Sequence, residues 1–342
     1  MPPLFNSRLI NDPSGDPGIF ISFPFNKRAM AFDLGDIYNL SPRDILKISH
    51  IFITHTHMDH FIGFDRLLRI ILGRDQTVYL YGPENFLKNI EGKLAAYSWN
   101  LVKNFTNPLT FIVTEITNDK LITQKYICEH KFCPTKAPST ISLKLPILHE
   151  EPSLQVATAI LDHGIPSLGF SIKEKVRINI RKDALAELGL MPGPWVYQFK
   201  QALFDNQNPD SIVNVLYDKN ISTPRKKYKL RDLEQHLVVY TKGQKIAYIA
   251  DVAYTSSNVE KIIKLANGAD HLYIESGFLE KDIDHATRKF HLTARQAGKI
   301  AGLAGAKRFT LFHFSPRYTH THAEKDFYTE ATDAYTDSFK AS

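Results

Sequence analysis

The residues best suited to chemistry follow an apolar, β-branched run at 50–54. His55, His57, Asp59 and His60 put four metal-competent side chains within six residues. The run predicts a buried strand, so these side chains lie where the strand ends. His55 and His57 are two apart and point to one side of extended backbone, whereas the adjacent Asp59 and His60 point in different directions. This spacing suits two neighbouring ions better than a polar turn. Imidazole and carboxylate ligands favour zinc, with manganese or iron as competitors.

Three further candidate ligands follow apolar, strand-like runs elsewhere in the chain: His163, Asp251 and His313. A carboxylate such as Asp251 can bridge two cations and hold them about 3.5–4 Å apart. Two such ions lower the pKa of a shared water and stabilise negative charge on a phosphoryl or acyl oxygen. Phosphodiester cleavage also needs a proton donor for the leaving oxygen. His291 is a candidate, with Thr293 as helix cap; a surface histidine at a helix start is the alternative.

The elements that must position these residues are strands interspersed with helices, which predicts an α/β protein. Strands are predicted at 19–23, 29–35, 50–54, 78–81, 109–116, 121–128, 141–147, 154–161, 245–250, 270–274 and 308–312. A helix is predicted to begin at Pro42 with Ser41 as its N-cap, and others are predicted at 64–72, 83–96, 258–267 and 293–304.

The bulk properties predict one domain over 1–342, with an inserted arm at 176–240. The chain has 342 residues, of which 43% are hydrophobic and 23% charged, as in ordinary globular proteins. It contains no apolar run long enough to cross a bilayer and no secretory signal, so we expect no membrane association. Two cysteines argue against a disulfide framework and favour the cytoplasm.

The arm is basic and rich in proline. Residues 171–245 contain 14 Lys and Arg against 8 Asp and Glu, a difference equal to the net charge of +6. This excess predicts binding to a polyanion, and a solvated surface with a chance excess of lysine explains it equally well.

Several motifs, taken together, resemble the ribonuclease Z (tRNase Z) branch of the metallo-β-lactamase superfamily. The resemblance covers roughly residues 28 to 320. The first matching motif is 54–60, which is preceded by 31–35. The other matching motifs are 162–170, 189–194, 273–278, 291–297 and 311–318. The resemblance implies an αββα sandwich that cleaves the 3′ trailer from precursor tRNA. It also implies that the arm grips the tRNA body and that the protein is a homodimer.

The resemblance implies roles for individual residues as well. One ion would be held by His55, His57 and His163, the other by Asp59, His60 and His313, with Asp251 bridging. A hydroxide activated by the metals would attack phosphorus, Asp59 would orient it or accept its proton, and His291, oriented by Glu275, would protonate the leaving oxygen. The residues expected to contact substrate are Ser315, Arg317, Pro192, Gly193 and Pro194.

Two departures from the family pattern motivate alternative functions. Residues 11–18 lack the glycine-rich loop usual near the N-terminus, and Asp251 lies between Ala250 and Val252 where the family has Gly-Asp-Thr. A diverged metallo-hydrolase acting on a small phosphodiester or another ester is the second hypothesis. A metal-dependent RNA-binding protein without catalysis is the third, against which the full ligand set argues.

Overall fold

The computed structural model describes residues 4–24, 26–105, 107, 109–142, 146–215, 226–318 and 324–340. The chain divides into two compact units, which we describe separately. The larger unit comprises Phe5–Leu148, Val156–Ile172 and Lys245–Ser342, and the smaller comprises Met1–Leu4, His149–Gln155 and Lys173–Gln244.

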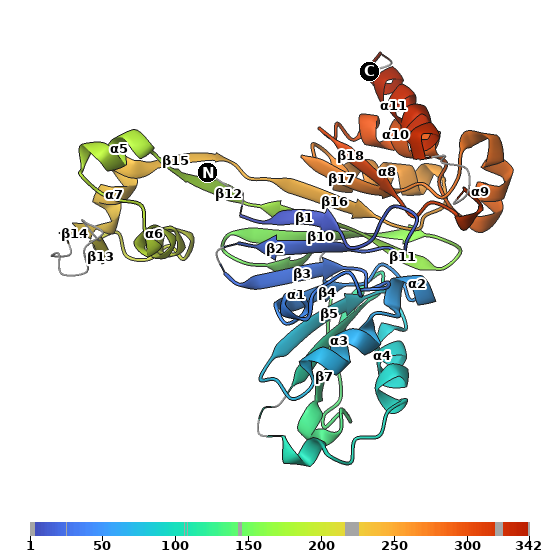
Figure 1. Cartoon of the computed structure of the whole chain (residues 1–342), viewed down its shortest axis with the longest axis horizontal. Coiled ribbons are helices and arrows are strands. Elements are labelled where there is room, and N and C mark those ends of the chain that lie inside the picture. The colour runs from blue at the N-terminus through green and yellow to red at the C-terminus, as the bar shows by residue number, and fades with distance from the viewer. Residues whose placement is uncertain are drawn as a thin grey trace. The chain divides into compact units, whose positions relative to one another are not determined.

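The first sheet of the larger unit has eight strands in sequence order, with parallel pairing from β3 to β6 (Figure 1). Its strands are β1 (Asn6–Leu9), β2 (Ile19–Phe23), β3 (Arg28–Phe32), β4 (Ile48–Phe52), β5 (Thr77–Gly82), β6 (Thr110–Ile116), β7 (Lys120–Ile127) and β8 (Ser139–Ser142). The helical segments between them are α1 (Pro42–Ile45), α2 (Met58–Phe61), α3 (Phe64–Ile71), α4 (Phe86–Ala95), η1 (Val102–Asn104) and η2 (Cys128–His130). Ser41 caps α1 and Pro42 is its first residue, as predicted.

The second sheet has six strands in the order β18-β17-β16-β11-β10-β9. They are β9 (Ile147–Glu150), β10 (Leu154–Asp162), β11 (Pro166–Glu174), β16 (Lys245–Ile249), β17 (His271–Glu275) and β18 (Phe309–Phe312). The accompanying helices are α8 (Ser256–Ala266), η3 (Glu280–Asp282), α9 (Ile283–Lys289), α10 (Ala294–Leu303), η4 (Pro316–Tyr318) and α11 (Glu324–Lys340).

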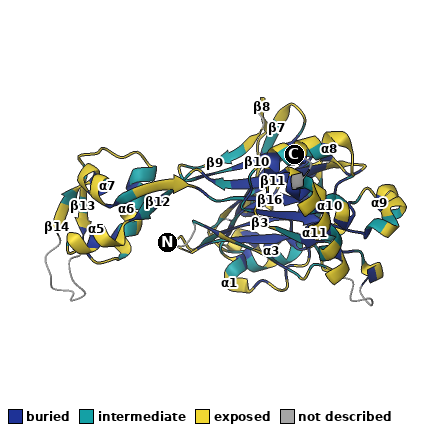
Figure 2. Ribbon diagram, turned by 90° about the horizontal axis from the view of Figure 1, so that it is seen from above, coloured by how far each residue is buried: buried dark blue, intermediate teal, exposed yellow. Residues whose placement is uncertain are grey.

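Aromatic side chains join the inner faces of the two sheets. Phe170 of the second sheet lies 5.6 Å, centroid to centroid, from both Phe32 and Phe52 of the first, and Tyr248 lies 6.1 Å from Phe32. The outer face of the first sheet packs on α3 and α4, and α8, α10 and α11 pack in the core of the second. Buried strands thus form the interior and the helices expose their outer faces (Figure 2). The predicted αββα sandwich is confirmed.

The smaller unit contains the predicted arm and has a hydrophobic core of its own. Its elements are β12 (Val176–Ile180), α5 (Lys182–Glu187), α6 (Pro194–Phe204), β13 (Ile212–Val215), β14 (Lys226–Lys229), α7 (Leu230–Leu237) and β15 (Val238–Lys242). β12 pairs antiparallel with β15, and β13 with β14. Trp195, Phe199 and Leu233 are buried in the core of this unit. Residues 216–225 of the predicted arm lie outside the described residues.

One local prediction needs correction, and some elements were not predicted. The strand predicted at 141–147 is not continuous, because β8 ends at Ser142 and β9 begins at Ile147, with 143–145 outside the described residues. The helix α11 and the strand β11 were not predicted. Among the described residues, no helix combines the length and the apolar character needed to cross a bilayer.

Candidate metal centre

The predicted ligands of the larger unit meet at the ends of four strands. His55 follows β4, His163 follows β10, Asp251 follows β16 and His313 follows β18. Helix α2 begins directly after His57 and carries Asp59 and His60, so a strand end and a helix start together supply four of the side chains. Loops at strand ends are a common place for functional groups because the sheet fixes their position.

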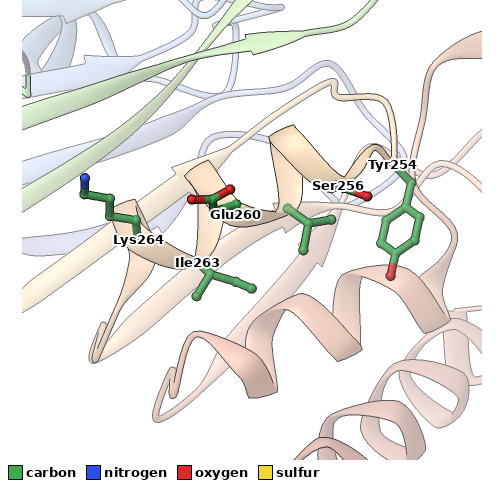
Figure 3. Close-up of a pocket in the computed structure, with 6 residues that line it drawn as sticks. Tyr254, Ser256, Glu260, Ile263 and Lys264 are labelled. Atoms are coloured by element: carbon green, nitrogen blue, oxygen red, sulfur yellow. The ribbon is translucent and has the colours of Figure 1, made fainter.

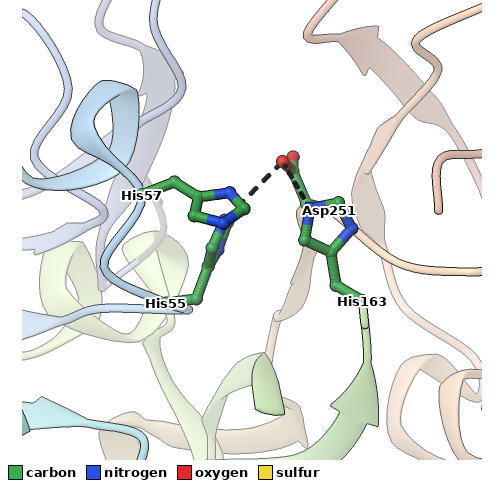
Figure 4. A group of neighbouring side chains, drawn as sticks. All are labelled: His55, His57, His163 and Asp251. Atoms are coloured by element: carbon green, nitrogen blue, oxygen red, sulfur yellow. Dashed lines mark ion pairs between the residues drawn. The ribbon is translucent and has the colours of Figure 1, made fainter. Parts of the chain in front are cut away.

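The side chains fall into two groups, each able to hold one ion. His55, His57, His163 and Asp251 converge in the first (Figure 4), and Asp59, His60 and His313 form the second. Within each group, one ligand atom from every residue lies within 4.8 Å of the others.

Asp251 faces both groups with different oxygens. Its Oδ2 lies 3.5 Å from His163 Nε2 and 3.7 Å from His55 Nε2. Its Oδ1 lies 2.8 Å from His313 Nδ1 and 3.4 Å from His60 Nε2. A carboxylate placed this way between two sets of ligands is the arrangement that a bridging ligand requires.

A buried carboxylate fixes the ring of His60. Asp33 is fully buried and its Oδ2 lies 2.9 Å from His60 Nδ1. The same carboxylate accepts hydrogen bonds from Thr54 N (2.7 Å), Thr54 Oγ1 (2.9 Å) and the Tyr248 hydroxyl (2.9 Å). Because an ionised carboxylate only accepts, Nδ1 of His60 donates, and in the neutral ring the lone pair lies on Nε2, toward the centre.

His163 and His55 are oriented by the same logic with other partners. His163 Nδ1 donates to the Phe290 carbonyl at 2.8 Å. Thr54 Oγ1 gives its proton to Asp33, so it accepts from His55 Nδ1 at 3.1 Å. In each ring the second nitrogen, Nε2, is left with its lone pair directed at the other ligands.

The donor set fits divalent metal ions. The buried Nε2 atoms of His55 and His60 make no hydrogen bond in the described part of the chain. Such groups are costly to bury without a partner, and a metal ion satisfies them. Nitrogen and carboxylate oxygen are ligands that zinc, manganese and iron accept.

The protonation of the ligands differs sharply. Burial, reinforced by the charge of His60, lowers the pKa of His55 to about 2, which keeps this ring neutral and able to ligate. Burial also disfavours a charged His60, yet the Asp251 and Asp33 carboxylates outweigh it and raise the pKa to about 10. A metal ion at the second group must therefore displace a proton.

His291 lies beside the ligands, where a proton donor would act. Its ring centroid is 4.9 Å from that of His163 and 5.3 Å from that of His313. Its Nδ1 lies 3.2 Å from Oε1 of Glu275, which is fully buried. Burial disfavours the charged ring, but the Glu275 carboxylate outweighs burial and raises the pKa of His291.

Backbone donors hold Glu275 in place. Its Oε1 accepts from Val252 N (3.0 Å) and Leu292 N (3.1 Å), and its Oε2 accepts from Gly277 N (3.1 Å). Thr293 caps α10 two residues after His291, and the predicted cap is completed by Gln296 in a capping box.

The residues predicted to contact substrate are divided between the two units. Arg317 pairs with Asp282 at 3.0 Å, and Ser315 is half-buried, its amide donating to the Gly277 carbonyl at 3.0 Å. Pro192, Gly193 and Pro194 belong to the smaller unit, where Gly193 precedes α6. A role in substrate binding stays a prediction for all five.

Two cavities in the described part of the larger unit are lined by residues other than the metal-competent side chains. One cavity of about 560 Å³ is lined by Tyr254 and by side chains of α8, including Glu260 and Lys264 (Figure 3). Another of about 1160 Å³ lies between α3 and the loops around Tyr38 and Trp99.

Comparison with known proteins agrees with the fold. Residues 222–314 match a β-lactamase superfamily domain. The matched range includes Asp251, Glu275, His291 and His313. The chain is 24% identical to ribonuclease Z of Deinococcus radiodurans over 320 residues, covering 92% of this chain and 91% of that protein. Its fold is similar to the metallo-β-lactamase fold protein YhfI of Bacillus subtilis (TM-score 0.52, 14% identity, 96% and 92% covered). It is also similar to the short form of human tRNase Z (TM-score 0.51, 18% identity, 92% of each chain).

The chain has the metallo-β-lactamase fold. Its residues 222–314 are similar to a β-lactamase superfamily domain, and its strand-end histidines with Asp251 could hold divalent metal ions. In sequence the chain is similar to ribonuclease Z.

Proposed function

We propose that the protein is an endoribonuclease that removes 3′ trailers from precursor tRNA. The observation that carries the proposal is the pairing of two ligand groups through Asp251 with His291 and Glu275 at their edge. The ribonuclease Z relatives, which the chain matches over most of their length, support the choice of tRNA.

In this proposal His55, His57 and His163 hold one ion, Asp59, His60 and His313 hold the other, and Asp251 contacts both. When bound, the two ions supply a water of lowered pKa and positive charge for the phosphoryl oxygens.

The chain's own residues handle the protons. Asp59 is partly exposed and its Oδ2 lies 3.1 Å from His313 Nε2, so its carboxylate can orient the attacking water or accept its proton. His291 donates a proton to the leaving 3′ oxygen, and Glu275 orients it and raises its pKa. The pairing of Asp59 with His313 and of His291 with Glu275 holds the geometry of both groups before substrate arrives.

The basic arm, residues 176–240, is proposed to bind the tRNA body. Its excess of cations supports this role. Some of these cations already have carboxylate partners: Lys229 and Arg231 lie 3.0 and 3.3 Å from Asp210, and Arg177 lies 3.0 Å from Glu174. The pairs with Asp210 are exposed, and such pairs contribute little, so phosphates can compete for them.

We further propose zinc as the resident metal, a homodimeric assembly and a cytoplasmic location. The ligand types support zinc, and the family resemblance supports the dimer. Both cysteines, Cys128 and Cys133, are free thiols, which supports a reducing compartment.

The test is a parallel assay of the metal-loaded protein on a 3′-extended tRNA and on a simple chromogenic phosphodiester. We expect efficient cleavage of the tRNA, and deletion of 176–240 should abolish it while hydrolysis of the small diester persists. If the deletion variant cleaves tRNA as well as the intact chain, the tRNA proposal fails. A small-diester hydrolase is then the better description, as the altered 11–18 region and Val252 also suggest.

A further inference from the structure

An aromatic side chain without an assigned role lies next to the proton donor. Phe290 precedes His291, and its side chain is 44% exposed although it is large and apolar. Its backbone is left-handed, with φ of 59°, a conformation that bulky residues rarely adopt. An exposed aromatic in an unfavourable conformation beside a catalytic group calls for a functional explanation.

The left-handed backbone comes from the way helix α9 ends. The Phe290 amide donates to the Thr287 carbonyl at 3.2 Å and the His291 amide donates to the Ala286 carbonyl at 3.0 Å. These two bonds are those of a Schellman motif, in which glycine is the usual residue at the position of Phe290. Glycine would satisfy the helix end, so the end itself does not explain the aromatic ring.

The ring is held against the turn that carries a metal ligand. A Cβ atom added at Gly164 would lie 3.0 Å from the Phe290 ring, so the ring covers this glycine. Its centroid is 6.4 Å from that of His163, and the Phe290 carbonyl accepts from that histidine at 2.8 Å. Part of the ring thus lies against Gly164 while 44% of the residue stays open to solvent.

Neighbouring ligand segments also expose apolar side chains. Met58 lies between His57 and Asp59 and is 76% exposed, and Ile165 follows His163 by two residues and is 39% exposed. A metal centre for a phosphate group is therefore bordered by apolar side chains rather than by polar ones alone. A nucleotide matches this border, because its phosphate is anionic and its base is flat and apolar on both faces.

We infer that Phe290 is a specificity-determining residue on which the base of a nucleotide flanking the scissile phosphate stacks. The choice of a nucleobase rests on the proposed nuclease function. Stacking on a single aromatic side chain corresponds to about tenfold in affinity, near the lower end of the usual range. Because every base has a π-face, the contact favours nucleotides over other esters without selecting a sequence.

The test compares a short single-stranded RNA with the same RNA carrying one abasic nucleotide beside the scissile phosphate. Metal-loaded wild-type protein should bind the intact RNA about tenfold more tightly than the abasic one. Phe290→Asn should bring this ratio close to one, because asparagine tolerates the left-handed backbone but cannot stack as an aromatic ring does. Phe290→Tyr should keep the ratio, and the exposed Phe105, replaced by Asn, is a matched control that should leave it unchanged.

The outcome is independent of whether the chain cleaves tRNA. A wild-type ratio of one, or a ratio that survives Phe290→Asn, overturns the stacking role. Equal weakening of both RNAs by Phe290→Asn, with the ratio intact, assigns Phe290 a structural role and also overturns the inference. A tenfold ratio in a protein that leaves 3′-extended tRNA intact refutes the proposed substrate but supports the stacking site.

Discussion

Replacing Asp33 with asparagine should weaken metal binding more than a loss of packing would. Asp33 is fully buried, has φ of 57°, and accepts four hydrogen bonds, one of them from His60 Nδ1 at 2.9 Å. Asparagine tolerates this backbone and has nearly the same volume. Its amide group, however, has a single accepting oxygen and no charge, so one side of the network meets an amide N–H and His60 Nδ1 loses the ionised acceptor that directs Nε2 at the metal.

The size of the effect follows from the network. Loss of a partner that orients a metal-bound histidine costs about 10- to 100-fold in metal affinity, or about 1.4–2.8 kcal/mol. Two hydrogen bonds to a charged group are weakened, which should lower the free energy of unfolding of the metal-free protein by about 3 kcal/mol. Competition with a zinc chelator measures the first quantity, and denaturant unfolding of the metal-free protein measures the second.

Tyr248→Phe is the matched control. It removes one hydrogen bond to the same carboxylate without touching His60, so we expect about 1–2 kcal/mol less stability and a metal affinity within about threefold of wild type. The reasoning is refuted if Asp33→Asn lowers stability as predicted but binds metal as tightly as the Tyr248→Phe variant.

Three further predictions test other parts of the site. Glu275→Gln should lower the pKa of His291, since the carboxylate raises this pKa in the native protein. The protonated donor exists below that pKa, so the alkaline limb of the kcat/KM profile should move to lower pH. An unchanged alkaline limb would exclude this role for Glu275. Asp251→Ala should remove both bound metal and hydrolysis, as checked by metal analysis of the purified variant, and activity without metal would contradict the two-ion site. Thr293→Ala removes the side-chain half of a capping box and should destabilise the protein by about 1 kcal/mol in thermal or denaturant unfolding, with the metal content unchanged.

The sequence allowed the ligand cluster to be predicted because its information is local. A buried strand followed by His55, His57, Asp59 and His60 indicates, within ten residues, both where the ligands lie and that they can bind metal. His163 and the other strand-end residues could be selected by the same local pattern. The capping of α10 was predictable for this reason too, since the whole capping box lies within four residues.

The orienting residues could not be predicted because their partners are distant in the sequence. Asp33 is 27 residues from His60 and 215 from Tyr248, and no periodicity relates these positions. Asp33 lies in the 31–35 segment that resembles the family, and the resemblance implies no role for it. The role of Phe290 could not be predicted for a different reason. The left-handed end of a helix is normally indicated by glycine, and a phenylalanine gives no such signal.

The arm shows a third limit of sequence interpretation. Its prolines and charges predict an irregular insertion, but Trp195, Phe199 and Leu233 form the centre of a small folded unit. Its apolar residues are spread over short helices and strands, so no single window shows strong periodicity. The missed helix α11 is similar, because its buried Phe327 and Ala331 are spaced by four residues within a mostly polar segment.

The end of helix α9 links the two halves of the proposed chemistry. The Phe290 carbonyl orients His163, a candidate metal ligand, and the next residue, His291, is the candidate proton donor. One backbone conformation therefore sets the position of both groups, and it does so whatever side chain occupies position 290. The side chain is consequently free to serve the substrate, whereas the carbonyl serves the metal. A substitution at this position that preserves the left-handed backbone should change which molecules bind and leave the metal centre intact.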